Sequence, residues 1–201
     1  LHLCSHNLEK MEANNYDSNN ARHKLLAEVC MAAKYEGNSI DTHYTIYKVT
    51  NEGTASQLCT VLARSFADIG DIVRGRDLFL GNTHESKQRD KLEKNLKDIF
   101  AKIHEEVTTN GKKPALQARY EGDDKKNFYR LREDWWTANR ETVWKALTCD
   151  PRHKAEYFRK TPCAGKTATD DKCRCNGDKP GEDKANVDPP TYFDYVPQYL
   201  R

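Results

Sequence analysis

The chain has 201 residues, which is enough for one substantial domain or two small subdomains. Charged residues make up 32% and apolar residues 37%, a balance typical of long charged helices around a modest core. The formal net charge of +2 is too small to indicate a nucleic-acid partner, so a basic binding surface has to come from local clustering. No apolar run is long enough to span a membrane, and no signal peptide is recognisable.

The first predicted helix covers residues 21–36. Its apolar residues recur at helical spacing and predict a buried face: Leu25, Leu26, Val29, Ala32 and Ala33. Gly37-Asn38 is typical of a helix C-terminus, so we predict that the helix ends there. In residues 39–53 apolar and polar residues alternate too irregularly for a strand, so we predict a connection that lies over the core.

The next predicted helix begins near Thr54 or Ser56 and includes the stretch ARSFADIGDIVRGRDLF at 63–79. Its apolar face consists of Leu58, Val61, Leu62, Phe66, Ile69, Ile72 and Val73. Gly70 and Gly75 interrupt this helix, and each costs about 1 kcal/mol relative to alanine. We interpret both as close contacts with another helix or backbone, with a ligand contact as the alternative. A phosphate-binding loop is excluded because Arg76-Asp77 stands where Lys-Ser/Thr is required.

Two further long helices are predicted, over 86–108 and 125–148, with a short one between them at 115–120. The 86–108 helix has one narrow apolar stripe: Leu92, Leu96, Ile99, Phe100, Ile103 and Val107. The 125–148 helix, with Asp124 as its N-cap, has two apolar rows and is expected to be central. The rows are Phe128, Leu131, Trp135 and Ala138, and Tyr129, Trp136, Val143 and Leu147.

The remainder of the chain predicts a short helix from Asp150-Pro151 to Phe158 and then a long exposed loop over 164–190. The aromatic residues of 192–199 are expected to dock back onto the helices. We expect the chain to be a piece of a larger secreted or membrane-anchored protein.

Seven irregularly spaced cysteines favour a disulfide-linked extracellular domain, with at least one thiol left over. The candidates for disulfides are Cys4, Cys30, Cys59, Cys149, Cys163, Cys173 and Cys175. Cys59 and Cys149 lie at ends of two helices that would meet if the helices are antiparallel, so we predict a Cys59–Cys149 bridge. The alternative, a zinc site at Cys163, Cys173 and Cys175 with His153, fits no standard ligand spacing.

No catalytic constellation and no metal or cofactor site is predicted. His84-Glu85 and His104-Glu105-Glu106 lack the second histidine of a zinc-protease helix, and His104 is expected to be solvated. Carboxylates alternate with Lys and Arg at helical spacing, as surface ion pairs do.

Basic residues cluster at a few places and are candidates for binding an anionic partner such as a sulfated glycan. The predicted receptor- or glycan-binding residues are Lys112, Lys113, Lys125, Lys126 and Arg130, with Arg132 beside them. Further groups lie at 87–97 and 152–160. The alternative for each cluster is a solvated helix face, because acidic residues are interspersed.

Four long blocks together resemble a Duffy-binding-like domain of the alpha class, found in the malaria parasite's erythrocyte membrane protein 1 family. They are LLAEVCMAAKYEG at 25–37, ARSFADIGDIVRGRDLF at 63–79, NFYRLREDWWTANRETVWKALTC at 127–149 and YVPQYLR at 195–201. The resemblance covers most of the chain but only part of the usual domain. It implies the end of a first subdomain with the first helix at 1–38 and the bundle core of a second at 39–163. Residues 164–201 would then be a variable cysteine-containing loop and the start of a connection to a third.

The resemblance implies an all-α, disulfide-linked helical bundle with long surface loops, displayed outside the infected red blood cell as part of a membrane-anchored protein. Members of the class take part in cytoadhesion and rosetting. Their partners include complement receptor 1, heparan sulfate, blood-group sugars, host antibodies and neighbouring domains of the same chain. By this resemblance the chain is a receptor-binding module of a variant surface antigen and not an enzyme. Two alternatives remain: a helical scaffold and antigen without its own receptor site, and an intracellular enzyme or metal-thiol protein.

Overall fold

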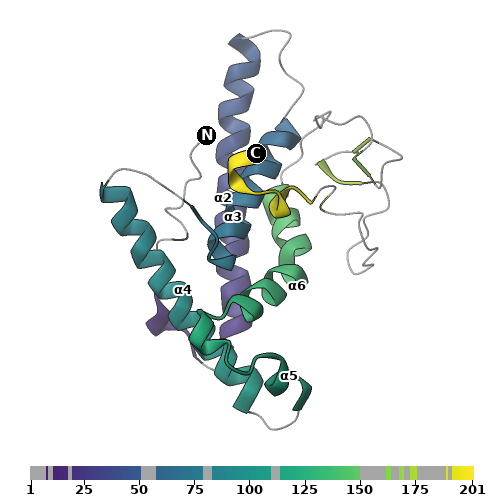
Figure 1. Cartoon of the computed structure of the whole chain (residues 1–201). Coiled ribbons are helices and arrows are strands. Elements are labelled where there is room, and N and C mark those ends of the chain that lie inside the picture. Colours follow the sequence, from purple (N-terminus) through teal and green to yellow (C-terminus); the bar gives the residue numbers. More distant parts are fainter. Residues whose placement is uncertain are drawn as a thin grey trace. The chain divides into compact units, whose positions relative to one another are not determined.

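The computed structural model is mostly α-helical (Figure 1). It describes residues 8, 11–17, 20–50, 58–78, 83–109, 114–149, 162–163, 168–169, 173–175, 189 and 192–201. The long helices are α2 (Ala21–Thr50), α3 (Leu58–Arg74), α4 (Thr83–Thr109) and α6 (Tyr129–Leu147). The short elements are α5 (Pro114–Arg119), η1 (Ala13–Asn15), η2 (Asp124–Lys126), η4 (Phe193–Tyr195) and η5 (Gln198–Leu200). The predicted all-α, disulfide-linked fold class is confirmed.

The chain divides into two compact units. The first unit consists of residues 1–3, 33–69 and 140–201, and the second of residues 4–32 and 70–139. Helices α2, α3 and α6 each contribute residues to both units. The three-part subdomain division expected from the resemblance stays a prediction.

Helix α2 is longer than predicted and runs as one continuous helix (Figure 1). Gly37 does not end it, so the connection predicted over residues 39–53 is wrong for residues 39–50. A Cβ atom on Gly37 would lie only 2.0 Å from the carbonyl oxygen of Leu147 in α6. The glycine is therefore required by the close approach of two helix backbones within the first unit.

Helix α3 ends in a glycine turn of the Schellman type. Gly75 has a φ of +72°, its N–H donates to the Ile72 carbonyl at 3.1 Å, and the Arg76 N–H donates to the Asp71 carbonyl at 2.8 Å. These bonds satisfy carbonyls that the end of a helix otherwise leaves unpaired.

Both glycines of α3 and its turn lie against side chains of α6. A Cβ atom on Gly70 would lie 2.8 Å from Cζ2 of Trp136, and one on Gly75 would lie 2.8 Å from Cζ of Arg132. The interpretation of both glycines as contacts between helices is confirmed.

The apolar stripe predicted for α4 is also confirmed. Its buried members are Leu92, Leu96, Ile99, Phe100 and Ile103, while Val107 is half-buried. The helix begins three residues earlier than predicted, at Thr83, and ends at Thr109.

Helix α6 begins later than predicted, at Tyr129. Residues 124–126 form the 3-10 turn η2, and Asn127 and Phe128 follow with φ of +57° and +59°. Two successive left-handed residues without glycine break the helix that the sequence pattern predicts from Lys125.

The predicted N-cap, Asp124, is wrong, because the first N–H groups of α6 bond to the side chain of Asp123, which precedes the turn before the helix. The carboxylate of Asp123 accepts hydrogen bonds from the N–H groups of Arg130 at 3.1 Å and Leu131 at 2.9 Å. Asp123 is buried, whereas Asp124 is exposed. The left-handed turn at Asn127 and Phe128 brings the Asp123 carboxylate back to the start of the helix.

The two apolar rows predicted for α6 are confirmed over most of its length. The buried residues are Leu131, Trp135, Trp136, Val143 and Leu147. Tyr129 and Ala138 are exposed, and Phe128 is half-buried in the turn before the helix, so their assignment to the core is wrong.

Two disulfides lie in the first unit, Cys59–Cys173 and Cys163–Cys175. The predicted Cys59–Cys149 bridge is therefore wrong, and Cys149 is a half-buried free thiol. The prediction considered only the helices, but residues 173–175 also lie at the C-terminal end of α6. There the guanidinium of Arg174 donates to the Lys145 carbonyl at 2.7 Å and to Thr148 Oγ1 at 3.1 Å.

Cys30, in the second unit, is also a free thiol. Burial raises the pKa of the Cys30 thiol to about 11, so it is protonated and unreactive at neutral pH. Cys4 lies outside the described residues.

Candidate binding surfaces

The structure describes only part of the predicted basic cluster. Lys112 and Lys113 lie outside the described residues, as does the side chain of Lys126. Lys125 and Arg130 are exposed, and Nη1 of Arg130 donates to the Arg119 carbonyl at 2.7 Å. Their role in receptor or glycan binding stays a prediction.

Arg132 is not part of any exposed cluster, because its side chain is fully buried in the second unit. Its guanidinium donates to the carbonyls of Val73 at 2.7 Å and Ile72 at 3.1 Å, and pairs with both oxygens of Glu93 at 2.8 and 2.9 Å. The interpretation of Arg132 as a surface cation is wrong. It is a structural residue that caps the C-terminal end of α3 with positive charge.

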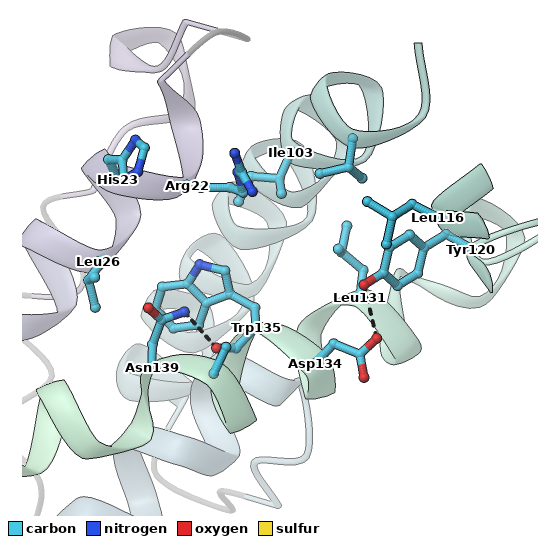
Figure 2. A pocket seen from close by; sticks show the side chains of 12 residues that line it. Arg22, His23, Leu26, Ile103, Leu116, Tyr120, Leu131, Asp134, Trp135 and Asn139 are labelled. Carbon is cyan, nitrogen blue, oxygen red and sulfur yellow. Dashed lines mark hydrogen bonds between the residues drawn. The ribbon is translucent and has the colours of Figure 1, made fainter. Parts of the chain in front are cut away.

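The second unit contains a cavity of about 320 Å³, here called the apolar pocket (Figure 2). It is lined by Arg22, His23, Leu26, Ile103, Val107, Leu116, Tyr120, Leu131, Asp134, Trp135, Ala138 and Asn139. Figure 2 shows the Trp135 side chain in the middle of these residues, with Arg22 and His23 on one side and Tyr120 with Asp134 on the other. No sequence pattern predicted this pocket, because four helical segments contribute to it.

Ion pairs at the mouth of the apolar pocket join its walls. Arg22 on α2 binds Glu106 on α4 at 2.8 Å. Arg119 binds both oxygens of Asp134, at 2.5 and 2.6 Å, and the Tyr120 hydroxyl donates to the same carboxylate at 2.9 Å. These bonds fix α2 to α4 and α5 to α6.

The same hydrogen bonds change the titration of the groups involved. The hydrogen bond from Arg119 holds the pKa of the Asp134 carboxyl below its ordinary value. Burial, followed by the hydrogen bond to Asp134, raises the pKa of the Tyr120 hydroxyl. Near neutral pH the wall therefore carries an ionised carboxylate and a protonated phenol.

The sequence predicted a solvated His104, and this prediction is wrong. Its ring lies against those of Tyr120 and Phe128, with centroids 6.5 and 5.5 Å away, and its Nε2 is 3.3 Å from the Tyr120 carbonyl oxygen. His104 therefore packs the turn before α6 against α4. Among the residues that the structure describes, no group of His, Cys, Asp and Glu is arranged to hold a metal ion.

The first unit has a more polar cavity of about 360 Å³, lined by Glu36, Val61, Arg64, Ser65, Asp68, Gln198 and Arg201. The Ser65 hydroxyl donates to the buried Glu36 carboxylate at 3.1 Å, and Arg201 pairs with Asp68 at 3.1 Å. Its charges are of both signs and are linked to one another.

Comparison with known proteins establishes the family. The Duffy binding domain model matches residues 1–201. The chain belongs to the Duffy-binding-like domain family. No curated protein sequence matches it significantly.

Among solved structures, the chain is similar to the NTS-DBL1α-1 domain of the Plasmodium falciparum membrane protein 1 (PfEMP1) from the varO strain. The identity is 44% and the TM-score 0.72, over 99% of this chain and 40% of that one. It is also similar to the PfEMP1 IT4var13 DBLβ domain bound to ICAM-1, with 32% identity and a TM-score of 0.53, over 74% and 34% of the two chains. A third match is a PfEMP1 DBLβ domain bound to human ICAM-1, with 26% identity and a TM-score of 0.61, over 99% and 36%.

These matches confirm the resemblance to the alpha class of PfEMP1 Duffy-binding-like domains. The chain spans well under half the length of the solved chains that it matches. Within its described part, no helix is both long and apolar enough to cross a membrane.

The C-terminal residues of this Duffy-binding-like chain dock onto the first unit, as predicted. The guanidinium of Arg140 on α6 donates to both carboxylate oxygens of the buried Asp194, at 2.9 and 2.7 Å. The same guanidinium lies 5.7, 5.1 and 5.7 Å from the ring centroids of Phe66, Tyr192 and Tyr195. Arg140 thus contributes to the docking beside the Arg201–Asp68 pair, and the sequence pattern had not singled it out.

Proposed function

We propose that the chain is an adhesion module of a variant surface antigen, located outside the infected red blood cell. It binds host cell receptors or sulfated glycans on red cells or endothelium and has no catalytic activity. The observation that carries this proposal is the match to PfEMP1 Duffy-binding-like domains, two of which were solved in complex with ICAM-1. ICAM-1 itself is a partner of those domains. For this alpha-class chain the candidates are complement receptor 1, heparan sulfate and blood-group sugars.

A second function, a scaffold and antigen without its own receptor site, is favoured by one specific observation. Arg132, beside the predicted basic cluster, is buried and paired with Glu93. Its charge is therefore not available to an anionic glycan.

Binding of the folded chain to intact red cells, to endothelial cells and to immobilised heparin across a salt series tests both functions. The adhesion module predicts saturable binding to at least one of these, and the scaffold predicts none. If heparin is bound, reversing the charge of Lys112, Lys113 and Lys125 to Glu should weaken retention at least tenfold.

The matched control reverses Lys87, Lys91 and Lys94, three lysines of α4 with exposed side chains. The net charge changes by the same amount in both triple variants. Equal loss of retention in the two would show that overall charge, and not the predicted cluster, decides heparin binding.

A further inference from the structure

The apolar pocket has the size and lining of a site for a single large side chain. Its volume of about 320 Å³ lies at the lower end of the range of ligand pockets, about 300–1,000 Å³. The large apolar residues in its lining are Leu26, Ile103, Val107, Leu116, Leu131 and Trp135. The pocket opens to the surface beside exposed residues such as His23 and Ala138. An apolar group that enters it gains burial on several sides.

The charged groups at the mouth are already paired with one another. Arg22 binds Glu106, and Asp134 binds Arg119 and Tyr120. A charged occupant would have to replace one of these bonds and lose its own hydration, which offsets what it gains. An uncharged occupant requires neither change.

Two polar side chains remain suited to orienting an uncharged occupant. Asn139 uses its amide nitrogen to donate to the Trp135 carbonyl at 2.7 Å, and His23 uses Nδ1 toward Asn20 at 3.3 Å. Within the contacts that the structure describes, Asn139 Oδ1 and His23 Nε2 are therefore among the atoms that can hydrogen-bond an incoming group.

We propose that the apolar pocket receives one uncharged aromatic or branched aliphatic side chain presented by a protein partner. This rests on the proposed adhesion function and narrows its partner class from protein or glycan to protein. Buried aromatic anchors in preformed pockets carry most of the binding energy at protein interfaces. The pocket is lined by the packed core residues Ile103, Leu131 and Trp135, so it exists before binding and little ordering is needed.

An oligosaccharide matches the pocket less well. Its hydroxyl groups need several hydrogen-bonding partners, but most lining residues are apolar and the polar atoms at the mouth are largely engaged with one another. A sulfated sugar would in addition meet the Asp134 carboxylate.

The test uses N-acetyl-tryptophanamide, an uncharged model of an aromatic anchor, with N-acetyl-glycinamide as a backbone-only probe and a heparin oligosaccharide as the glycan. Binding to the folded chain is followed by NMR shifts of the protein's indole N–H signals. Ala138→Trp fills the mouth of the pocket from an exposed position on α6. Ala101→Trp, on the exposed face of α4 and outside the pocket lining, is the matched control.

We expect saturable binding of N-acetyl-tryptophanamide to the wild-type chain and the Ala101→Trp variant, and at least tenfold weaker binding to Ala138→Trp. N-acetyl-glycinamide should not bind. The proposal is overturned if the tryptophan probe does not bind, if Ala138→Trp binds it equally well, or if only the heparin oligosaccharide is sensitive to Ala138→Trp.

The probe experiment involves no receptor, so its result is independent of the cell-binding test. Cell binding that survives in Ala138→Trp together with lost probe binding would overturn the pocket's role in adhesion but keep the adhesion function. Probe binding without any cell binding would contradict the adhesion function instead.

Discussion

The two units of this chain differ in the interactions that stabilise each of them internally. The first unit contains both disulfides that the structure describes, together with the arginine–aspartate pairs Arg140–Asp194 and Arg201–Asp68. In the second unit, the described residues form no disulfide. It depends on the apolar stripes of its helices and on buried ion pairs around Arg132 and Arg74.

The difference concerns the C-terminal segment of the first unit, which has little apolar surface to bury. Residues 192–201 of the first unit bury the charged side chains of Asp194 and Arg201, while Tyr199 is 78% and Leu200 66% exposed. A segment with so little buried apolar surface gains little from the hydrophobic effect, so ion pairs hold residues 192–201 in place. Disulfides do the same for Cys163, Cys173 and Cys175. In contrast, α4 buries five large apolar residues along one stripe and needs no covalent link.

Removing the Cys59–Cys173 disulfide should give the largest effect on stability, and the loss of local protection should be greatest in the first unit, where both cysteines lie. This bond closes a sequence separation of 114 residues, for which loop entropy gives about 5 kcal/mol. For Cys163–Cys175, with a separation of 12, the same relation gives about 3 kcal/mol. Hydrogen exchange of the two double Cys→Ala variants should show lost amide protection in the first unit. An equal loss in the second unit would refute the contrast between them.

In the second unit, Arg132→Met should lower the free energy of unfolding by about 3 kcal/mol. It leaves the carbonyls of Ile72 and Val73 without their donor and Glu93 without its buried partner. Urea unfolding followed by circular dichroism measures the change. Lys97→Met is the control, because Lys97 also pairs with Glu93 but is exposed, and it should cost less than about 1 kcal/mol. Similar losses in the two variants would show that the Arg132 contacts contribute little.

Gly70→Ala should have a smaller effect, about 1 kcal/mol. The added methyl group would meet the Trp136 indole at 2.8–2.9 Å, and this overpacking exceeds the gain in helix propensity. Combining it with Trp136→Phe in a double-mutant cycle should show a favourable coupling, because the smaller ring leaves room for the methyl group. If the two changes in unfolding free energy are strictly additive, the contact with Trp136 is not the reason for a glycine at position 70.

The smallest expected effect concerns Asp134 at the pocket mouth. Its pKa is lowered by the hydrogen bond from Arg119, so its contribution to stability is present above the ordinary carboxyl pKa. The contribution is lost as the pH falls through the lowered value. Asp134→Asn should therefore lower Tm slightly at about pH 7, and the difference from wild type should shrink as the pH falls below the ordinary carboxyl pKa. A difference that persists in acid would contradict this linkage.

Periodicity predicted the helices well where a helix buries an unbroken apolar stripe, as α4 does. It failed at Gly37 and at Lys125, for opposite reasons. Gly37 is required by a contact with Leu147, which is distant in sequence. The local pattern Gly-Asn therefore predicted a helix end where the glycine in fact allows close packing. At Lys125 the left-handed Asn127 and Phe128 interrupt a stretch that has every local signal of a helix.

Of the candidate sites, sequence identified charged clusters but not the apolar pocket. Arg132 has neighbours in sequence that are basic, yet it is buried because its guanidinium meets the end of α3. The apolar residues of its lining had been interpreted as core positions. The pocket could not be predicted from them, because its concave surface forms only where separate helices meet.

The sequence by itself determined the family, the all-helical class, and the contact role of Gly70 and Gly75 within ARSFADIGDIVRGRDLF. These depend on residue order and on helical spacing, which are local properties. Only the tertiary structure decided which cysteine reaches Cys59, which arginine is buried, and where a pocket opens. Those outcomes depend on which distant segments meet, because Arg174 brings Cys173 to the end of α6 while Cys149, one residue beyond Thr148, stays a free thiol.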